Sequence, residues 1–243
     1  ALENNTTASY NVAMGHNALA SNTTGASNVA IGDGALVGNT TASENTAIGH
    51  RALLANSTGT QNVAVGGYAL TSDTTGGNTA VGYKALTTNT TGDYVTALGY
   101  NALELNTTGA SNTAVGYKAL EANTTATENT AVGTEALKAN TTGNSNTALG
   151  RKALFSNTTQ SFNVAIGEGT LFSNTGGNSD TAVGTQALYA NTTGSRNTAV
   201  GKAALTANTT GDNNTVVGEG AGDSITTGSE NTIVGQGAAE AIT

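Results

Sequence analysis

The chain has 243 residues, a formal net charge of −8, 33 glycines, no cysteine and only 4% aromatic residues. So few large side chains favour a thin repeating structure over a globular core, and the lack of cysteine excludes disulfides and thiolate metal sites. The eight lysines and arginines are dispersed among sixteen acidic residues, so nucleic acid is not expected as a partner. No apolar run approaches the roughly 20 residues of a membrane span, so no membrane contact by this chain is expected.

One short pattern, NTAVG with small edits, recurs fourteen times along the chain. Its glycine is taken as position 0 of each repeat, and it recurs every 17 residues except that Gly82 follows Gly66 after 16. A fixed short period is the signature of a solenoid, in which each repeat forms one turn of a coil. The aligned glycines are Gly15, Gly32, Gly49, Gly66, Gly82, Gly99, Gly116, Gly133, Gly150, Gly167, Gly184, Gly201, Gly218 and Gly235.

Two apolar elements are expected in each turn. Position −1 is always aliphatic and position −2 is alanine in twelve repeats, which predicts a strand buried on both faces because adjacent strand residues face opposite sides. Position +3 is alanine except at Thr170, and position +4 is leucine from Leu19 to Leu205, which predicts a second strand. We expect the valine and leucine rows to fill the coil, and the alanine rows to face another copy of the chain.

Polar corners separate these elements. Position +7 opens an N-T-T-G corner, for which asparagine and glycine are suited, and Asp73 is its one acidic member. Stacked turns would place these amides about 4.8 Å apart, within hydrogen-bonding reach along a row. The corner triplets are also formal glycosylation sequons, for example at Asn5, but the turn role alone accounts for the asparagine. The predicted structural row is Asn22, Asn39, Asn56, Asn89, Asn106, Asn123, Asn140, Asn157, Asn174, Asn191 and Asn208.

Convergent catalytic residues are missing from this pattern, so neither an enzyme nor a cofactor is expected. The two histidines, His16 and His50, both lie at corner position +1, and no metal site is predicted from them. Two sets of exposed residues are candidates for surface binding, with local reinforcement of the coil as the alternative reading of the aromatic run at position +5. The candidates are Tyr83, Lys84, Tyr117 and Lys118 at positions +1 and +2, and Phe155, Phe172 and Tyr189 at position +5.

The repeats change towards the end of the chain. We expect regular repeats over residues 1–217 and divergent ones over residues 218–243, as a transition towards another module. The chain begins and ends within a repeat, so we expect a segment of a longer chain or a unit whose ends dock on neighbours. The exchanged apolar positions are Val216, Gly222, Ile225, Ile233, Ala239 and Ile242.

The motifs NVAIG at residues 28–32 and 163–167 and NTAIG at residues 45–49, each followed by an aligned turn, resemble the repeats of YadA-like heads of trimeric autotransporter adhesins. The longer form with N-T-T-G is similar to the repeat arrays of bacteriophage tail fibres and related bacterial surface proteins. This resemblance implies a left-handed parallel β-roll that trimerises at a cell surface or on a virion fibre. Those heads typically have a shorter period. Some bind matrix proteins such as collagen, which would point first to residues 28–32 and 163–167.

The expected fold is an all-β parallel β-solenoid, or β-roll, of about fourteen 17-residue turns, with two short strands per turn and assembled as a homotrimer. The expected function is a structural, non-catalytic segment of an extracellular fibre, with copies of itself as partners and a host surface protein or glycan as a further partner. The first alternative is an adhesin head that binds a host or matrix protein directly through its side. A less favoured alternative is an ice-binding solenoid with threonine rows at −3, +8 and +9, the first interrupted by Val12, Val29, Val63 and Val164.

Overall fold

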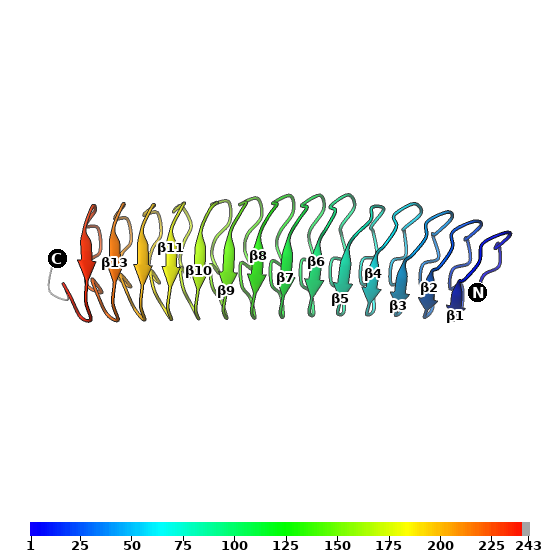
Figure 1. The fold of residues 1–243 in the computed structure, drawn as a ribbon, viewed down its shortest axis with the longest axis horizontal. Helices are drawn as coiled ribbons and strands as arrows, with labels where there is room; N and C mark the ends of the chain where they lie inside the picture. The colour runs from blue at the N-terminus through cyan, green and yellow to red at the C-terminus, as the bar shows by residue number, and fades with distance from the viewer. Residues whose placement is uncertain (240–243) are drawn as a thin grey trace. The chain divides into compact units, whose positions relative to one another are not determined.

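The computed structural model describes residues 1–239 and divides into two compact units, residues 1–125 and a second unit that begins at Ala126. Each unit is a parallel β-solenoid in which every turn contributes one strand of three residues, at positions −3 to −1 (Figure 1). No helix is present within residues 1–239. The prediction of an all-β parallel solenoid with about 17 residues per turn is confirmed.

The strands follow the repeat in both units. Those of the first unit are β1 (Val12–Met14), β2 (Val29–Ile31), β3 (Thr46–Ile48), β4 (Val63–Val65), β5 (Thr79–Val81), β6 (Thr96–Leu98) and β7 (Thr113–Val115). Those of the second unit are β8 (Thr130–Val132), β9 (Thr147–Leu149), β10 (Val164–Ile166), β11 (Thr181–Val183), β12 (Thr198–Val200), β13 (Thr215–Val217) and β14 (Thr232–Val234).

Neighbouring strands pair in the register of the repeat, with like residues side by side. Ala13 pairs with Ala30 in the first unit and Ala165 pairs with Ala182 in the second. The shortened repeat keeps this register, because Ala64 still pairs with Ala80 across the 16-residue spacing. The missing residue is therefore absorbed in the corner before the strand, and Gly77 at position −5 keeps the left-handed φ that Gln61 and Tyr94 have at this position.

The prediction of a second strand in each turn is wrong. Residues at positions +3 and +4 form a turn, in which the leucines from Leu19 to Leu205 all adopt left-handed φ values between +50° and +55°. Such residues cannot continue an extended strand. They are nevertheless bonded from turn to turn, since the Leu19 N–H donates to the Ala35 carbonyl at 3.0 Å and the pattern repeats at Leu36 and Ala52.

The expectation that alanine rows face another copy of the chain is also wrong. The alanines at −2 and +3, such as Ala30 and Ala35, are wholly buried together with Leu36. The aliphatic residues at −1 point outward instead, and Leu98 is 40% exposed. A 17-residue turn encloses too little space for bulky side chains from both sides. Leucine at +4 therefore fills the interior, and the strand opposite contributes alanine.

Asparagine side chains also lie inside the coil. Two of them meet on one carbonyl in the second repeat, where Asn28 Nδ2 and Asn39 Nδ2 donate to the Ala42 oxygen at 2.9 and 3.0 Å. Asn39 Nδ2 also donates to Asn22 Oδ1 of the preceding turn at 2.8 Å. The amides thereby satisfy buried backbone groups within a turn and join successive turns, which offsets the cost of their burial.

Two carboxyl groups interrupt these buried amide rows, one in each unit. Asp73 Oδ1 accepts from Asn89 Nδ2 at 2.7 Å, while Asp73 Oδ2 has no hydrogen-bond partner among the described residues. Asp180 Oδ1 accepts from the Asn197 N–H at 2.8 Å. Burial raises the pKa of Asp73 to about 6 and that of Asp180 to about 7, because the hydrogen bonds that each carboxyl accepts only partly offset the loss of solvent.

The Asp73→Asn variant should be more stable than the wild type at pH 7.5 and no more stable at pH 3.5. The ordinary pKa of aspartate is 3.8 and the folded pKa of Asp73 is about 6. As pH rises, the Asp73 carboxyl therefore loses its proton in the unfolded chain before it does so in the folded chain. The free energy of unfolding falls between pH 3.8 and about pH 6 and then levels off. Asparagine does not titrate, so we expect a gain of about 1–3 kcal/mol at pH 7.5.

Urea unfolding at the two pH values measures this difference. Asp93→Asn, at a partly exposed position in the next turn, is the control and should change stability by less than about 0.5 kcal/mol. A gain for Asp73→Asn that is equal at both pH values would show that the carboxylate is not what destabilises the site.

Candidate functional surfaces

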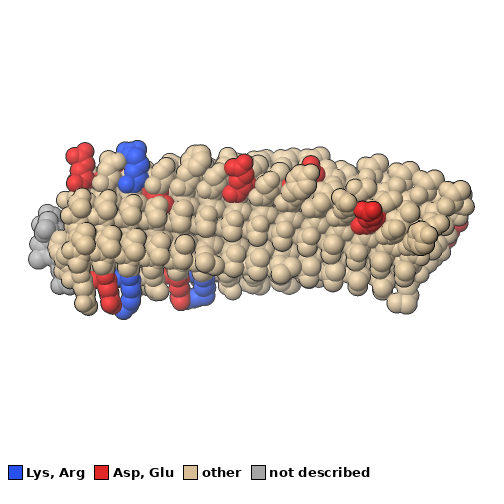
Figure 2. Space-filling view, viewed as in Figure 1, with Lys and Arg blue, Asp and Glu red and all other residues tan. Residues whose placement is uncertain are grey.

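In each unit the outer side of the strands forms an uncharged surface, called here the sheet face and made of positions −3 and −1. No charged residue occupies either position in any repeat. Several aliphatic side chains project from it, and Met14 is 62% exposed and Leu98 is 40% exposed. In Figure 2 most acidic and basic side chains lie along the upper and lower margins of the face shown, one acidic side chain lies further in towards the right, and uncharged residues make up the rest. Exposed apolar rows of this kind mark interaction surfaces.

A second feature of the first unit is a stack of tyrosines at position +1. The rings of Tyr83 and Tyr100 are 5.5 Å apart, and those of Tyr100 and Tyr117 are 5.7 Å apart, both pairs close to parallel. Tyr68 meets Tyr83 edge to face at 5.9 Å. The candidates Tyr83 and Tyr117 are therefore not neighbours. Tyr100 lies between them, and its place in the same phase of the repeat was the signal that could have found it.

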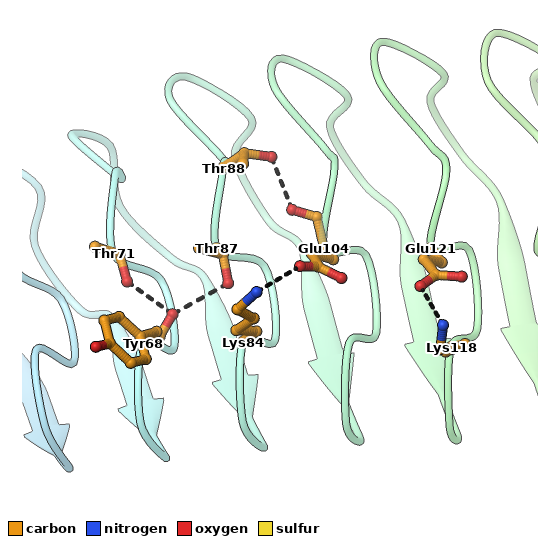
Figure 3. Close-up of polar contacts among 8 residues, drawn as sticks. All are labelled: Tyr68, Thr71, Lys84, Thr87, Thr88, Glu104, Lys118 and Glu121. Atoms are coloured by element: carbon orange, nitrogen blue, oxygen red, sulfur yellow. Dashed lines mark hydrogen bonds and ion pairs between the residues drawn. The ribbon is translucent and has the colours of Figure 1, made fainter.

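The two candidate lysines of the first unit are held by carboxylates. Lys84 Nζ lies 3.3 Å from Glu104 Oε1, and Lys118 Nζ lies 2.8 Å from Glu121 Oε1 (Figure 3). The hydrogen bond that Lys84 donates to Glu104 raises the pKa of Lys84 above its ordinary value. Both lysines thus lie in ion pairs beside the tyrosine stack, with Lys84 Nζ 6.0 Å from the centre of the Tyr83 ring.

Threonine hydroxyls fasten the same corners to the backbone. Thr71 and Thr87 both donate to the Tyr68 carbonyl, at 2.7 and 3.2 Å, and Thr88 donates to the Glu104 carbonyl at 2.8 Å (Figure 3). These bonds join three successive turns through side chains at positions +5 and +6. The turns that carry Tyr68, Tyr83 and Tyr100 are therefore joined through side chains as well as through the backbone.

The aromatic candidates of the second unit do form one cluster. The Phe155 and Phe172 rings stack at 5.1 Å with planes 2° apart, and Phe172 and Tyr189 stack at 5.1 Å with planes 10° apart. Lys138 and Lys152 hold their ammonium groups 5.6 and 5.3 Å from the centre of the Phe155 ring. A surface pocket lies beside this stack and is lined in part by Phe172 and Tyr189.

A cluster that sequence analysis missed joins the two histidines. Asp33 lies between them, with its Oδ1 2.9 Å from His16 Nδ1 and its Oδ2 3.2 Å from His50 Nδ1. The hydrogen bond with His16 holds the pKa of Asp33 below its ordinary value. Their shared position +1 on consecutive turns was the signal. Within residues 1–239 no group of three or more histidine, aspartate or glutamate side chains has the arrangement of a metal site.

The sequon asparagines differ in their exposure. Asn22, Asn89, Asn106 and Asn123 are wholly buried, and their Nδ2 atoms donate hydrogen bonds inside the coil. Asn5, in the first turn, is exposed. Attachment of a sugar at the buried positions is incompatible with this fold. The Nδ2 atom that would carry the sugar lies inside the coil and donates hydrogen bonds there.

Comparisons of the chain with protein-family models, with curated proteins and with solved structures find no match. Residues 1–239 contain no helix with the length and apolar character of a membrane span. Any functional assignment therefore depends on the geometry of the sheet face, the aromatic stacks and the pocket.

Removal of the middle ring of the second-unit stack should lower stability. The Phe172→Ala variant loses two stacked pairs, each worth about 0.5–1.5 kcal/mol beyond the area that it buries, so we expect a loss of about 1–3 kcal/mol in the free energy of unfolding. Phe162→Ala, at a phenylalanine that is 64% exposed in the same unit, is the matched control and should cost less than about 0.5 kcal/mol. Chemical denaturation measures both. Equal losses would show that the stack does not reinforce the coil.

Proposed function

We propose that this chain is a structural, non-catalytic segment of an extracellular fibre, located at a cell surface or on a virion, in which copies of the chain cover each other's sheet faces. The observation that carries the proposal is the sheet face itself, with its outward aliphatic row and its lack of charge in every repeat. Positions −3 and −1 of the sheet face carry no titratable residue in any repeat, which supports a projecting and presenting role over a catalytic one for that face.

A second copy is the occupant that fits the sheet face best. The face repeats with the pairing register of the strands, Ala13 with Ala30 and onward, so a partner must present apolar side chains at the same spacing. Another copy of this chain has that spacing by construction, and closed symmetry lets each copy cover the next. The homotrimer is the assembly implied by the resemblance of the NVAIG motifs, and we adopt it here.

The aromatic stacks favour a second candidate function, direct adhesion through the side of the coil. Tyr83, Tyr100 and Tyr117 expose a row of ring edges, with Lys84 and Lys118 beside them. Aromatic residues of this kind are enriched at binding surfaces. In this alternative a host surface protein or glycan binds at positions +1, +2 and +5, while the sheet face still holds the copies together.

A charge on the sheet face should separate the copies. In the Leu98→Glu variant a carboxylate would have to be buried against a partner without a cation opposite, which costs several kcal/mol. We expect the wild type to have three times the 23.8 kDa chain mass at micromolar concentration. On dilution, the assembly of the variant should come apart at a protein concentration at least tenfold higher than that of the wild type. Light scattering after size-exclusion chromatography measures both.

Leu105→Glu is the matched control, because it makes the same substitution at position +6 of the same repeat, away from the sheet face, where the leucine is 47% exposed. This variant should keep the wild-type mass, and circular dichroism should show the same strand content for both variants. A wild type that is monomeric at micromolar concentration, or a Leu98→Glu variant that assembles normally, would contradict the proposed assembly.

A further inference from the structure

A pocket of about 230 Å³ opens on the surface of the second unit beside the stack of Phe155, Phe172 and Tyr189. Its floor is Gly169, at position +2 of the turn that follows β10. Its walls come from three successive turns and are Arg151, Lys152, Glu168, Phe172, Gln186 and Tyr189. The pocket is smaller than the roughly 300–1,000 Å³ of sites for drug-sized ligands, so its occupant is a single small group.

The pocket exists because one side chain is missing from a row. Position +2 carries Lys152 in the turn before and Gln186 in the turn after, and both adopt left-handed φ values, 57° and 58°, close to the 63° of Gly169. Backbone conformation therefore does not require glycine here. A Cβ at Gly169 would also make only ordinary contacts, 3.5 Å from Tyr189 Cε2 and 3.8 Å from Gln186 Cγ. What glycine provides is space.

The lining combines cations with groups that recognise hydroxyls. Arg151 Nη2 donates to a Glu168 carboxylate oxygen, and a guanidinium has further N–H donors that suit a carboxylate. Lys152 Nζ lies 3.6 Å from Glu135 Oε2 and over the face of Phe155. Gln186 can both donate and accept, and Glu168 accepts. The Tyr189 ring presents its Cδ2–Cε2 edge to the floor, and aromatic edges carry positive charge.

We infer that this pocket binds a carboxylated sugar unit, such as a uronic acid residue of a glycan. Its carboxylate would lie between Arg151 and Lys152, against the positive ring edge of Tyr189, and its hydroxyls would bond to Glu168 and Gln186. Glu135 is shared between Lys152 and Lys138, whose Nζ lies 2.7 Å from Glu135 Oε1, so the lining residues and their ion-pair partners comprise three cations and two carboxylates and sum to a positive charge, on a chain whose net charge is −8. This local charge favours an anionic ligand over a neutral one.

The inference goes beyond the proposed fibre assembly and does not depend on it. All the lining residues occupy positions +1, +2 and +5 of one chain, whereas the sheet face consists of positions −3 and −1. A monomeric chain that binds a carboxylated sugar would contradict the assembly and leave the site intact. A trimer that binds none would do the reverse.

The test fills the pocket with the side chain that its neighbour already has. Gly169→Gln extends the Lys152 and Gln186 row into the pocket at a φ that glutamine adopts one turn later. The matched control is Gly220→Gln, at the same position +2 of a later turn, with a φ of +65° and nothing within 4 Å of its added Cβ. Saturation-transfer NMR with glucuronate, and with methyl glucoside as the neutral probe, measures binding to each protein.

We expect glucuronate to bind the wild type and the Gly220→Gln variant alike, and to bind Gly169→Gln at least tenfold more weakly. Methyl glucoside should bind the wild type at least tenfold more weakly than glucuronate. Should Gly169→Gln fail to fold, Arg151→Gln replaces it, since it removes only an exposed ion pair and should weaken glucuronate binding at least fivefold. Absence of glucuronate binding to the wild type, equal binding by the filled or Arg151→Gln variant, or equal binding of the neutral probe would overturn the inference.

Discussion

The close stacking of successive turns at the aligned glycine is the constraint on which the rest of the structure depends. A Cβ at Gly15 would lie 2.6 Å from the Gly32 oxygen, and one at Gly133 would lie 2.6 Å from the Gly150 oxygen. The aligned glycines adopt φ values between 127° and 143°, which side chains rarely permit. Only glycine lets the chain leave the strand at this angle with the next turn in contact. Every later position then repeats in phase, because each turn begins from the same backbone geometry.

Repetition of the backbone decides what the interior can contain. Each turn from Leu19 to Leu205 contributes one wholly buried leucine, and the opposite strand contributes alanine, so that Leu36 and Ala30 fill a cross-section too narrow for two large side chains. Most of the remaining interior positions are asparagines, whose amides bond to the buried carbonyls that a turn-rich backbone leaves unpaired. The left-handed leucines have an unfavourable conformation, of the order of 1 kcal/mol each, which the burial of each leucine offsets.

The period, the parallel pairing and the position of each strand could be predicted from sequence, because they follow from the spacing of the aligned glycine alone. The second strand and the direction of the alanine rows could not. The identity of Leu36 gives no sign of its left-handed φ, because leucine does not favour that conformation. The neighbouring backbone imposes it. An apolar pair such as Ala47 and Ile48 likewise cannot show which member points inward, because that depends on the width of the coil. The pocket at Gly169 is lined by side chains from three successive turns, so no single repeat could reveal it.

The pocket proposed as a binding site arises from a departure from the repeat. Since the hydrogen bonds between turns fix the backbone, an exchange at position +2 changes the surface and leaves the turn intact, as the shared left-handed φ of Lys152, Gly169 and Gln186 demonstrates. Thr170, the residue after that glycine, replaces the buried alanine of other turns and donates to the Gly184 carbonyl at 2.7 Å. The turn with the open surface is thus also the one with an additional bond to its neighbour. A repeat of this kind can acquire a binding site by the loss of one side chain, provided that the surrounding turns hold their places, and the regular turns on either side of Gly169 supply that condition.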